Sequence, residues 1–207
     1  MLTGEKIILR AREASDVAVL DVGLYNDVTT RSRADSRPWR PMPPGSAMSP
    51  YAPTDPSDEV AMFSIVERSS GDLAGEALLW GIDLHSRGAH VGLALLPSFR
   101  GRRLASDVLG VLAWYGFTVR GLHRLQIETL ASNTAMLNAA RRAGFAHEGT
   151  LSESAWVLGD YVDEVVLGLV ADRAAPSQHS HHQAVSASTT KNTSPTRGSP
   201  PTLTSHR

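Results

Sequence analysis

The sequence contains no cysteine among its 207 residues. Disulfide bonds, a thiol nucleophile and cysteine-ligated zinc are therefore excluded, and the redox compartment is left undetermined. The chain has no uninterrupted run of about 18 apolar residues, so we expect no membrane span. Its first residues lack the basic-then-apolar pattern of a secretory signal, which makes the cytoplasm the expected location. Gly-x-Ser-x-Gly, complete P-loop and His-Glu-x-x-His motifs are also absent.

Charge is distributed unevenly along the chain. Residues 1–171 hold 16 basic and 20 acidic side chains, whereas residues 172–207 hold 4 and 1. A mildly acidic body argues against a nucleic-acid-binding domain, which usually presents a basic face. The length and the hydrophobic content of 42% suit one globular domain with a sizeable core, which we place at residues 1–171.

The composition changes after Ala171. Residues 172–207 have no aromatic side chain and very few aliphatic ones, so they cannot bury enough apolar surface to offset the entropy of ordering. We therefore expect a disordered tail. A histidine cluster in it, His179, His181 and His182, has the composition of a transition-metal site. Within a disordered segment we interpret them as an adventitious binder, and we expect no functional metal.

A second unusual segment, residues 35–58, contains seven prolines. This density excludes a continuous helix or a central strand. Trp39, Met42, Met48 and Tyr51 supply apolar side chains that can anchor the segment to the domain. Loops of this length are often functional, but a surface insertion without a role fits equally well, and both interpretations stay open.

Hydrophobic periodicity predicts a mixture of helices and strands in the rest of the domain. The predicted helices are residues 14–24, 102–120 and 133–143. The predicted strands are residues 6–10, 60–67, 73–82, 89–95, 124–130, 146–157 and 161–170. The helix at 102–120 is the clearest, because its apolar side chains recur at spacings of three and four. These side chains are Leu104, Val108, Leu112, Tyr115 and Val119.

The start of this long helix carries the strongest chemical signal. A helix start exposes unpaired backbone N–H groups and partial positive charge, and it is a ready site for a phosphate. Gly101 and Ala105 are small enough to let a ligand approach the backbone, and Arg100, Arg102 and Arg103 attract an anion. Taken alone, the segment fits either a phosphate site or a basic loop that caps a helix without a ligand.

Several segments carry a family resemblance when they are taken in order. Arg100-Gly101-Arg102-Arg103-Leu104-Ala105 follows an apolar strand and resembles the acetyl-CoA-binding signature of the GNAT N-acetyltransferases, Arg/Gln-x-x-Gly-x-Gly/Ala. Asn133-Thr134-Ala135 and Ala143-Gly144-Phe145 resemble the second signature of that family. The opening at residues 2–16 and the endings at 148–151 and 159–163 resemble the branch that includes ribosomal-protein N-terminal acetyltransferases. The resemblance covers residues 1–171.

The resemblance implies a single α/β (α+β) domain with a mixed, mostly antiparallel sheet flanked by helices. Two central parallel strands, residues 89–95 and 124–130, would splay apart, and acetyl-CoA, as co-substrate, would lie in the split. Its pyrophosphate would meet backbone N–H groups of the first signature, and its pantetheine would pair with the strand. The implied cofactor-binding residues are Leu93, Ala94, Leu95, Arg100, Gly101, Arg102, Arg103, Leu104, Ala105 and Asn133.

Two positions depart from the family pattern. The inner glycine of the first signature is Arg103 here, and the serine that usually follows the start of the second signature is Met136. In some relatives that hydroxyl is thought to protonate the leaving thiolate, which Met136 cannot do. No tyrosine lies between Asn133 and Gly144 to replace it. A free thiol has a pKa near 8.5, so its thiolate is a tolerable leaving group and an acid is dispensable in principle.

The implied reaction is direct attack of a substrate amine on the thioester, which needs a general base and an oxyanion donor. The backbone N–H of Leu93, freed where the strands splay, is the expected oxyanion donor. Glu76, Glu128 and Glu153 are alternative candidates for the general base, because each lies in a predicted strand that can border the split. Glu153 also resembles a catalytic acidic position of the relatives. Taken singly, each glutamate is more typical of a surface charge.

For two other polar residues, His90 and Asp163, a structural role is the more common interpretation. A histidine can change its charge near neutral pH, and His90 precedes the cofactor strand, but a lone histidine is more often structural or exposed. Asp163 matches a recurrent aspartate of the family, for which we expect a structural hydrogen bond.

The acceptor and the alternative function are left open by the sequence. The amine acceptor is either a protein N-terminus, which would need a wide cleft, or a small molecule. A small amine would favour an enclosed pocket lined by Trp39 or Tyr51. A non-catalytic acyl-CoA-binding or sensor domain is the alternative function. We expect no nucleic-acid or membrane partner, and family analogy allows a homodimer.

Overall fold

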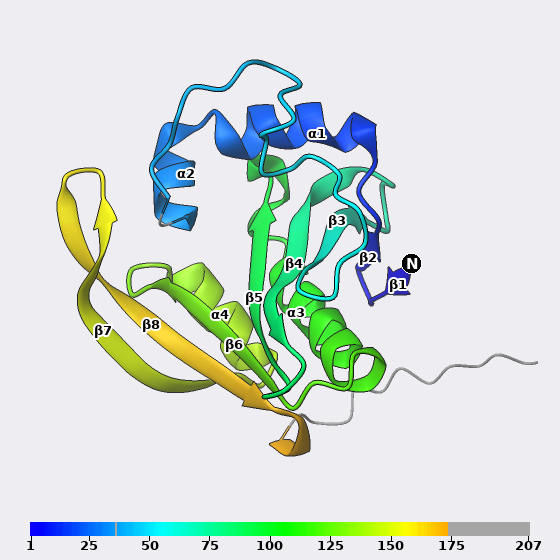
Figure 1. Ribbon diagram of the computed structural model, residues 1–207, viewed down its shortest axis with the longest axis vertical. Coiled ribbons are helices and arrows are strands. Elements are labelled where there is room, and N and C mark those ends of the chain that lie inside the picture. Colours follow the sequence, from blue (N-terminus) through cyan, green and yellow to red (C-terminus); the bar gives the residue numbers. More distant parts are fainter. Residues whose placement is uncertain (36, 174–207) are drawn as a thin grey trace, which may run out of the picture. The chain divides into compact units, whose positions relative to one another are not determined.

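The computed structural model describes residues 1–35 and 37–173, which all lie in one compact unit. Within these residues, eight strands form one sheet in the order β1-β2-β3-β4-β5-β6-β8-β7 (Figure 1). The strands are β1 (Leu2–Thr3), β2 (Ile7–Arg10), β3 (Ala61–Glu67), β4 (Leu73–Asp83), β5 (Gly88–Leu95), β6 (Arg124–Leu130), β7 (Ala146–Val157) and β8 (Asp160–Val170). All neighbouring strands are antiparallel except β5 and β6, which are parallel. The predicted mixed, mostly antiparallel sheet is confirmed.

The parallel strands β5 and β6 are paired only at their beginnings. Residues 88–90 pair with residues 124–126, and the pairing ends there. β5 stays paired with β4 up to Leu95, and β6 stays paired with β8 up to Leu130. Figure 1 shows the two strands diverging beyond this point. The predicted split is therefore present, and among the described strands residues 91–95 are paired on one side only.

A glycine in β4 allows β5 to take this position. Gly75 has a φ angle of 154° and lies opposite Leu95 in the register of the two strands. A Cβ atom on residue 75 would lie 2.1 Å from the backbone oxygen of Ala94. Any side chain here would push away the part of β5 that borders the split, so the geometry of the split depends on this glycine.

Within the described part of the chain, four α-helices flank the sheet, and short 3-10 or π-helical turns adjoin some of them. The helices are α1 (Ala14–Leu20), α2 (Val28–Ala34), α3 (Leu104–Trp114) and α4 (Thr134–Arg142), and the turns are Asp21–Tyr25, Pro97–Phe99, Tyr115–Val119 and Ala171–Arg173. α3 and α4 pack against each other. Figure 1 shows α1 and α2 near the end of the sheet at which β5 and β6 diverge. No helix of the described residues is both long and apolar enough to cross a membrane.

The long helix predicted at residues 102–120 is shorter in the structure. Leu104, Val108 and Leu112 are buried, as the spacing predicts. At Tyr115 the α-helix widens into a π-helical turn that ends at Val119. A π-helical turn holds more residues than an α-helical one, so the last apolar residue rotates away from the buried face. Val119, the last of the five recurring apolar residues, is therefore 54% exposed and does not share the buried face.

The first turn of α3 also holds the amino-terminal segment in place. The carboxylate of Asp107 accepts hydrogen bonds from the backbone N–H groups of Glu5, Lys6 and Ile7, at 3.1, 2.6 and 3.1 Å. A Cβ atom on Gly4 would lie 2.7 Å from the same carboxylate. The bend before β2 therefore fits around the Asp107 side chain. The carboxylate of Asp107 pairs with backbone N–H groups that would otherwise have no hydrogen-bond acceptor.

The proline-rich segment contains neither helix nor strand at residues 37–58, as its prolines predict. Tyr51 is almost completely buried, and Trp39 packs against the core. The Nε1 atom of Trp39 donates a hydrogen bond to a backbone oxygen of the π-helical turn after α1 at 3.1 Å. The prediction that Met48 anchors the segment is wrong, because its side chain is 83% exposed.

The sequence patterns do not predict two of the elements, α2 and the short β1. α2 has no regular apolar face, and its clearest signal is the residue before it. Asp27 caps the helix by accepting a hydrogen bond from the backbone N–H of Thr30 at 3.2 Å. Apart from its first two residues, the predicted tail at 172–207 lies outside the described residues, and so does its histidine cluster.

Candidate active site

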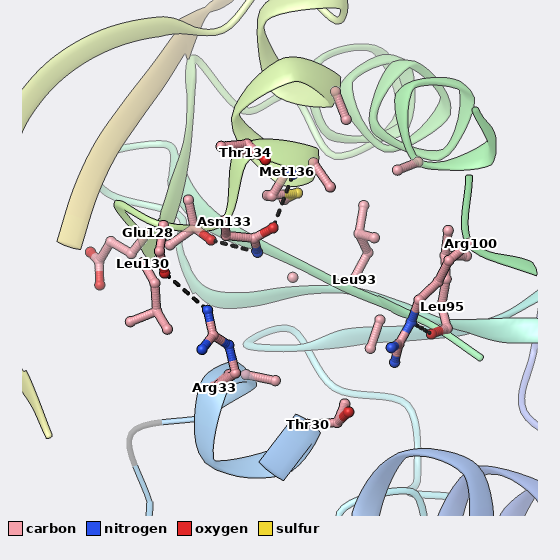
Figure 2. A pocket seen from close by; sticks show the side chains of 18 of the residues that line it. Thr30, Arg33, Leu93, Leu95, Arg100, Glu128, Leu130, Asn133, Thr134 and Met136 are labelled. Carbon is pink, nitrogen blue, oxygen red and sulfur yellow. Dashed lines mark hydrogen bonds between the residues drawn. The ribbon is translucent and has the colours of Figure 1, made fainter. Parts of the chain in front are cut away.

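The split between β5 and β6 opens into a cleft with a volume of about 840 Å³ (Figure 2). Its walls come from the end of α2, β5, the start of α3, the end of β6, α4 and the β7–β8 hairpin. Nine of the ten predicted cofactor-binding residues line it, which are Leu93, Ala94, Leu95, Arg100, Gly101, Arg103, Leu104, Ala105 and Asn133. This volume is typical of clefts that hold a ligand of cofactor size.

The backbone before α3 has two residues in the left-handed conformation. Gly101 has a φ angle of 77°, and Arg103, the N-cap residue of α3, has a φ angle of 63°. Glycine takes this conformation without cost, whereas other residues are strained in it. At the position of the missing signature glycine, the chain thus keeps a backbone shape that glycine favours and carries an arginine on it.

The three arginines of this segment point in different directions. The Nε atom of Arg100 donates a hydrogen bond to the backbone oxygen of Leu95 at 3.0 Å, inside the cleft (Figure 2). Arg102 is the predicted residue that does not line the cleft. Its Nη1 atom lies 3.0 Å from Oε2 of Glu67, and its guanidinium lies 4.8 Å from the ring centre of Phe99. A role for Arg102 in cofactor binding would therefore fall to its backbone.

Asn133 lines the cleft at the start of α4, where its side chain already has two partners. Its Oδ1 atom accepts from the backbone N–H of Met136 at 3.1 Å, which caps α4, and its Nδ2 atom donates to Oγ1 of Thr129 at 3.1 Å (Figure 2). These bonds fix the direction of the amide. The predicted bond to the cofactor arm stays a prediction, and it would use the remaining N–H or the second lone pair.

Of the three glutamates considered as general base, Glu128 alone lines the cleft. It lies on β6 just after the pairing with β5 ends, and its side chain is 39% exposed. Its Oε1 atom accepts a hydrogen bond from Nε2 of Gln126 at 2.7 Å. Figure 2 shows the Glu128 carboxylate pointing away from Leu93, so a proton from an amine near Leu93 would reach it most directly through a water.

Glu76 is buried in an ion pair beneath the proline-rich segment and does not line the cleft. Its Oε2 atom accepts from Nη2 of Arg12 at 3.0 Å, and the side chains of the pair are 14% and 3% exposed. Arg12 also donates to the backbone oxygen of Tyr51 at 3.3 Å. Burial raises the pKa of Glu76, and the charge of Arg12 opposes that rise. The structure therefore places Glu76 in a buried contact that, through Arg12, holds the proline-rich segment against the sheet.

Glu153 lies on the exposed β7–β8 hairpin, outside the walls of the cleft. It has a φ angle of 50° at an irregularity in the β7–β8 pairing. Its backbone N–H donates to Oδ1 of Asp163 at 2.9 Å. The structural hydrogen bond expected of Asp163 is thus present, and it holds the irregular turn of β7.

Sequence reasoning missed several residues that line the cleft. Thr30 and Arg33 belong to α2, and Glu164 lies on β8 opposite Leu130. The Nη2 atom of Arg33 donates to Oγ of Ser132 at 3.0 Å. The only local signal for the α2 residues is the Asp27 cap. Glu164 reaches the cleft through the β6–β8 pairing, which has no signature in the sequence. The predicted pocket residues Trp39 and Tyr51 do not line the cleft.

Charged side chains line the cleft from several elements, and they include Arg33 on α2 and Arg142 on α4. Arg100 and Arg103 lie at the start of α3, whereas Glu128 and Glu164 come from β6 and β8. This arrangement suits an anionic group beside α3 and a cationic group beside the carboxylates.

Comparison with known proteins agrees with this geometry. The family model described as an acetyltransferase (GNAT) domain matches residues 6–146. The chain therefore belongs to the GNAT acetyltransferase family. The family predicted from the sequence motifs is confirmed.

Among curated relatives, the spermidine N(1)-acetyltransferase of Vibrio cholerae is 26% identical over 48% of this chain and 57% of its own length. The corresponding protein of Escherichia coli K12 is 29% identical over 46% of this chain and 52% of its own. The chain thus spans about half the length of these relatives. The uncharacterized N-acetyltransferase YoaA of Bacillus subtilis is 23% identical over 84% of this chain and 98% of its own.

Solved structures share the fold. The spermidine N-acetyltransferase of Vibrio cholerae in complex with CoA and spermine has a TM-score of 0.68 at 19% identity, covering 81% of this chain and 97% of its own. RimJ of Mycobacterium smegmatis in complex with CoA-disulfide has a TM-score of 0.62 at 19% identity, covering 80% and 82%. At these identities the likeness establishes the fold.

Proposed function

We propose that this chain is an N-acetyltransferase that uses acetyl-CoA as its co-substrate and acetylates a primary amine. The observation that carries the proposal is the split between β5 and β6, which opens directly onto the start of α3. One edge of β5 presents backbone groups that no described strand uses, and the helix start presents unpaired N–H groups nearby. Membership in the GNAT acetyltransferase family supports the same activity.

The residues present fit acetyl-CoA, which supplies an activated thioester when it is bound. A pyrophosphate needs N–H donors and positive charge, and the start of α3 offers its backbone with Arg100 and Arg103 beside it. An extended arm that carries amides needs a strand edge, and residues 93–95 provide one. The small side chain of Ala105 keeps the first turn of α3 open to the cleft.

In the proposed reaction, the nitrogen of the acceptor attacks the carbonyl carbon of the thioester. A C–N bond forms, the C–S bond breaks, and its electron pair leaves with the sulfur. Glu128 takes the ammonium proton, directly or through one water, and the backbone N–H of Leu93 stabilises the developing oxyanion. The nitrogen loses its second proton as the tetrahedral adduct collapses to the amide. Met136 lines the cleft and has no proton to give, so this proton passes to solvent, and the departing thiolate takes its proton from solvent.

The acceptor that fits best is a small cationic amine, such as the spermidine named for the curated relatives. Two carboxylates, Glu128 on β6 and Glu164 on β8, line the cleft and favour a positive group, and the guanidinium of Arg33 nearby is held by Ser132. The hydrogen bond from Arg33 to Ser132 joins α2 to the loop before α4 across the cleft. This connection restricts access for a folded protein more than for a small amine. A protein N-terminus is the alternative acceptor, and a homodimer stays a prediction.

The first test is calorimetric titration with acetyl-CoA and with desulfo-CoA. We expect micromolar binding, and the change Ala105→Glu should weaken it at least tenfold because it places bulk and negative charge at the helix start. Ala146→Glu makes the same change at an exposed site of β7 outside the cleft and should bind like the unchanged protein. An unchanged protein that binds neither ligand would refute the cofactor assignment.

The second test measures turnover by thiol release with a panel of amines. The panel contains spermidine, spermine and a peptide with a free N-terminus, and we expect the polyamines to react fastest. Preferred turnover of the peptide would replace the small-amine acceptor. Binding of acetyl-CoA without turnover of any amine would favour the non-catalytic acyl-CoA sensor.

A further inference from the structure

We infer that Gln126 and His90 are positioning residues that hold one oxygen of Glu128 at the edge of the split. They belong to a row of side chains that crosses the sheet from β7 to β5. The row consists of Glu148, Arg124, Gln126, Glu128 and His90. This inference rests on the proposed function, in which Glu128 accepts the proton of the amine. None of these contacts follows from the family signatures, because the row runs across strands that are far apart in the sequence.

Gln126 makes the central contact of the row. Its Nε2 atom donates to Oε1 of Glu128 at 2.7 Å, and its Oε1 atom accepts from Nη2 of Arg124 at 3.2 Å. Arg124 can only donate, so it fixes which end of the amide faces it. A flipped amide would direct two donors at each other and two acceptors at each other. Arg124 therefore makes Gln126 a donor to Glu128.

Arg124 is itself anchored to β7. Its Nη1 atom donates to Oε1 of Glu148 at 2.8 Å, and its Nη2 atom contacts Oε2 of the same carboxylate. β8 lies between β6 and β7 in the sheet, and there Gly168 pairs with Gln126. A Cβ atom on Gly168 would lie 2.2 Å from Oε1 of Glu148. The glycine thus leaves the space in which the ion pair crosses over β8.

His90 approaches the same oxygen of Glu128 from the other side. Its Nδ1 atom lies 3.6 Å from Oε1 of Glu128, and its ring stacks on Trp80 with centroids 4.2 Å apart and an interplanar angle of 20°. The Nδ1 atom is inaccessible to solvent, and within residues 1–35 and 37–173 it has no hydrogen-bond partner. The stack fixes the ring, so in the tautomer that carries its proton on Nδ1 a small approach of Glu128 completes a hydrogen bond.

Gln126 and His90 both approach the Oε1 atom of Glu128, and this leaves the Oε2 atom for other partners. Among the described residues, the Oε2 atom of Glu128 accepts no hydrogen bond. The carboxylate is held at one oxygen, and the other is available to an ammonium group or to the water that bridges to it. The other charged or titratable groups of the row are His90, Arg124 and Glu148, and Glu164 and Arg33 line the same cleft.

The decisive test is a double-mutant cycle on the full chain with acetyl-CoA and the amine that it turns over. Gln126→Leu should lower kcat by between about 10- and 100-fold, as expected when a reacting group loses its alignment. The KM for acetyl-CoA should stay unchanged. In the Glu128→Gln background the same change should have no further effect on kcat, because Gln126 acts through Glu128.

His90 is tested with variants that separate its ring from its nitrogen. His90→Phe keeps the stack on Trp80 and removes Nδ1, and it should lower kcat several-fold. His90→Asn retains an N–H near the position of Nδ1 and should restore most of the loss. His147→Phe is the matched control, because His147 lies exposed on β7 outside the cleft, and its kcat should stay unchanged.

Three results would overturn the inference. The first is a loss of kcat from Gln126→Leu that is equally large in the Glu128→Gln background. The second is a rise of kcat in Gln126→Leu, which would mean that the row holds Glu128 away from the amine. The third is an unchanged kcat in Glu128→Gln itself. This result refutes the base assignment and the inference together, but it leaves the proposed activity standing, because the variant still transfers the acetyl group. Thermal melting of each variant separates these results from misfolding.

Discussion

Arg33 on α2 and Ser132 before α4 are 99 positions apart in the sequence, and a hydrogen bond of 3.0 Å from Nη2 to Oγ joins them at the cleft. Figure 2 shows the Arg33 side chain extending from α2 toward the end of β6. Both residues line the cleft. The bond therefore holds the first pair of helices against the half of the molecule that contains β6 and α4.

The first prediction concerns this bond. Arg33→Ala and Ser132→Ala should each raise the KM for the acceptor roughly 3- to 10-fold, the equivalent of one hydrogen bond of about 1 kcal/mol. The KM for acetyl-CoA should change little. Because both changes remove the same bond, the double variant should resemble either single variant. Additive effects in steady-state kinetics would contradict this explanation.

The second prediction separates the candidate bases. Glu128→Gln should lower kcat by about 10²- to 10⁴-fold, because the amine loses its proton acceptor, while acetyl-CoA binding stays normal. Glu153→Gln makes the same change on the exposed hairpin outside the cleft and should stay within about twofold of the unchanged protein. If thiol-release assays show the larger loss in Glu153→Gln, the assignment of roles is reversed.

The third prediction tests the left-handed residue at the start of α3. Arg103→Gly and Arg103→Ala both remove the guanidinium, so the difference between them isolates the backbone. The glycine variant should be more stable than the alanine variant by about 1 kcal/mol, because Ala retains the strain at a φ angle of 63°. Urea unfolding measures this difference. Equal stabilities would show that the backbone relaxes there.

The fourth prediction concerns acid stability and Asp16, which is buried between α1 and the sheet. Burial alone would raise its pKa, but hydrogen bonds from Arg10, from the backbone of Glu13 and from Ser64 together lower the pKa of Asp16 to about 2. An acid with a lowered pKa in the folded state stabilises fully above its unfolded pKa of about 4 and loses this contribution as the pH falls toward 2.

The variant Asp16→Asn should therefore cost stability at pH 7, by about 2 kcal/mol from this linkage alone. The cost should shrink between pH 4 and about pH 2 as the carboxyl group of the unchanged protein becomes protonated. Asp72→Asn makes the same change at an exposed site before β4, and as the control it should cost little stability. A cost of Asp16→Asn that stays constant in urea unfolding across this pH range would contradict the linkage.

The fifth prediction concerns the buried pair of Arg12 and Glu76. Glu76→Ala leaves a guanidinium that is 3% exposed without its partner and should destabilise the fold by about 3–5 kcal/mol. Glu59→Ala, at an exposed site, should have little effect. If Glu76→Ala does not fold, the double variant Arg12→Met, Glu76→Leu should recover much of the stability, because it removes both charges. Thermal melting checks both outcomes.

The strands could be predicted from the sequence because their faces alternate. β6 runs from Arg124 to Leu130 as predicted, and its buried Leu125 and Ile127 give the alternation. α2 could not be predicted in this way, because tertiary contacts stabilise it. Its Arg31 is buried, bonds to Asp35 and lies over the ring of Tyr25 at 5.3 Å. Such contacts leave no periodic pattern in the sequence.

The candidate site divides in the same way. One continuous segment forms the α3 side of the cleft, so its residues could be recognised from local sequence. The carboxylate side combines α2, β6 and β8, whose order in space follows from strand pairing. Even among neighbouring arginines the sequence could not assign directions. Arg102 turns away from the cleft because Glu67, on β3, is its partner.

The contact of Asp107 with the amino-terminal segment connects the start of the chain to α3, and hydrogen exchange can measure this connection. The amide hydrogens of Glu5, Lys6 and Ile7 are tied to a carboxylate about 100 positions later, in the first turn of α3. They exchange with solvent only when those bonds open. A ligand that reduces the motion of α3 would slow deuterium uptake in the amino-terminal peptide that contains these residues. That peptide would thus act as a built-in reporter of cleft occupancy while lying outside the cleft itself.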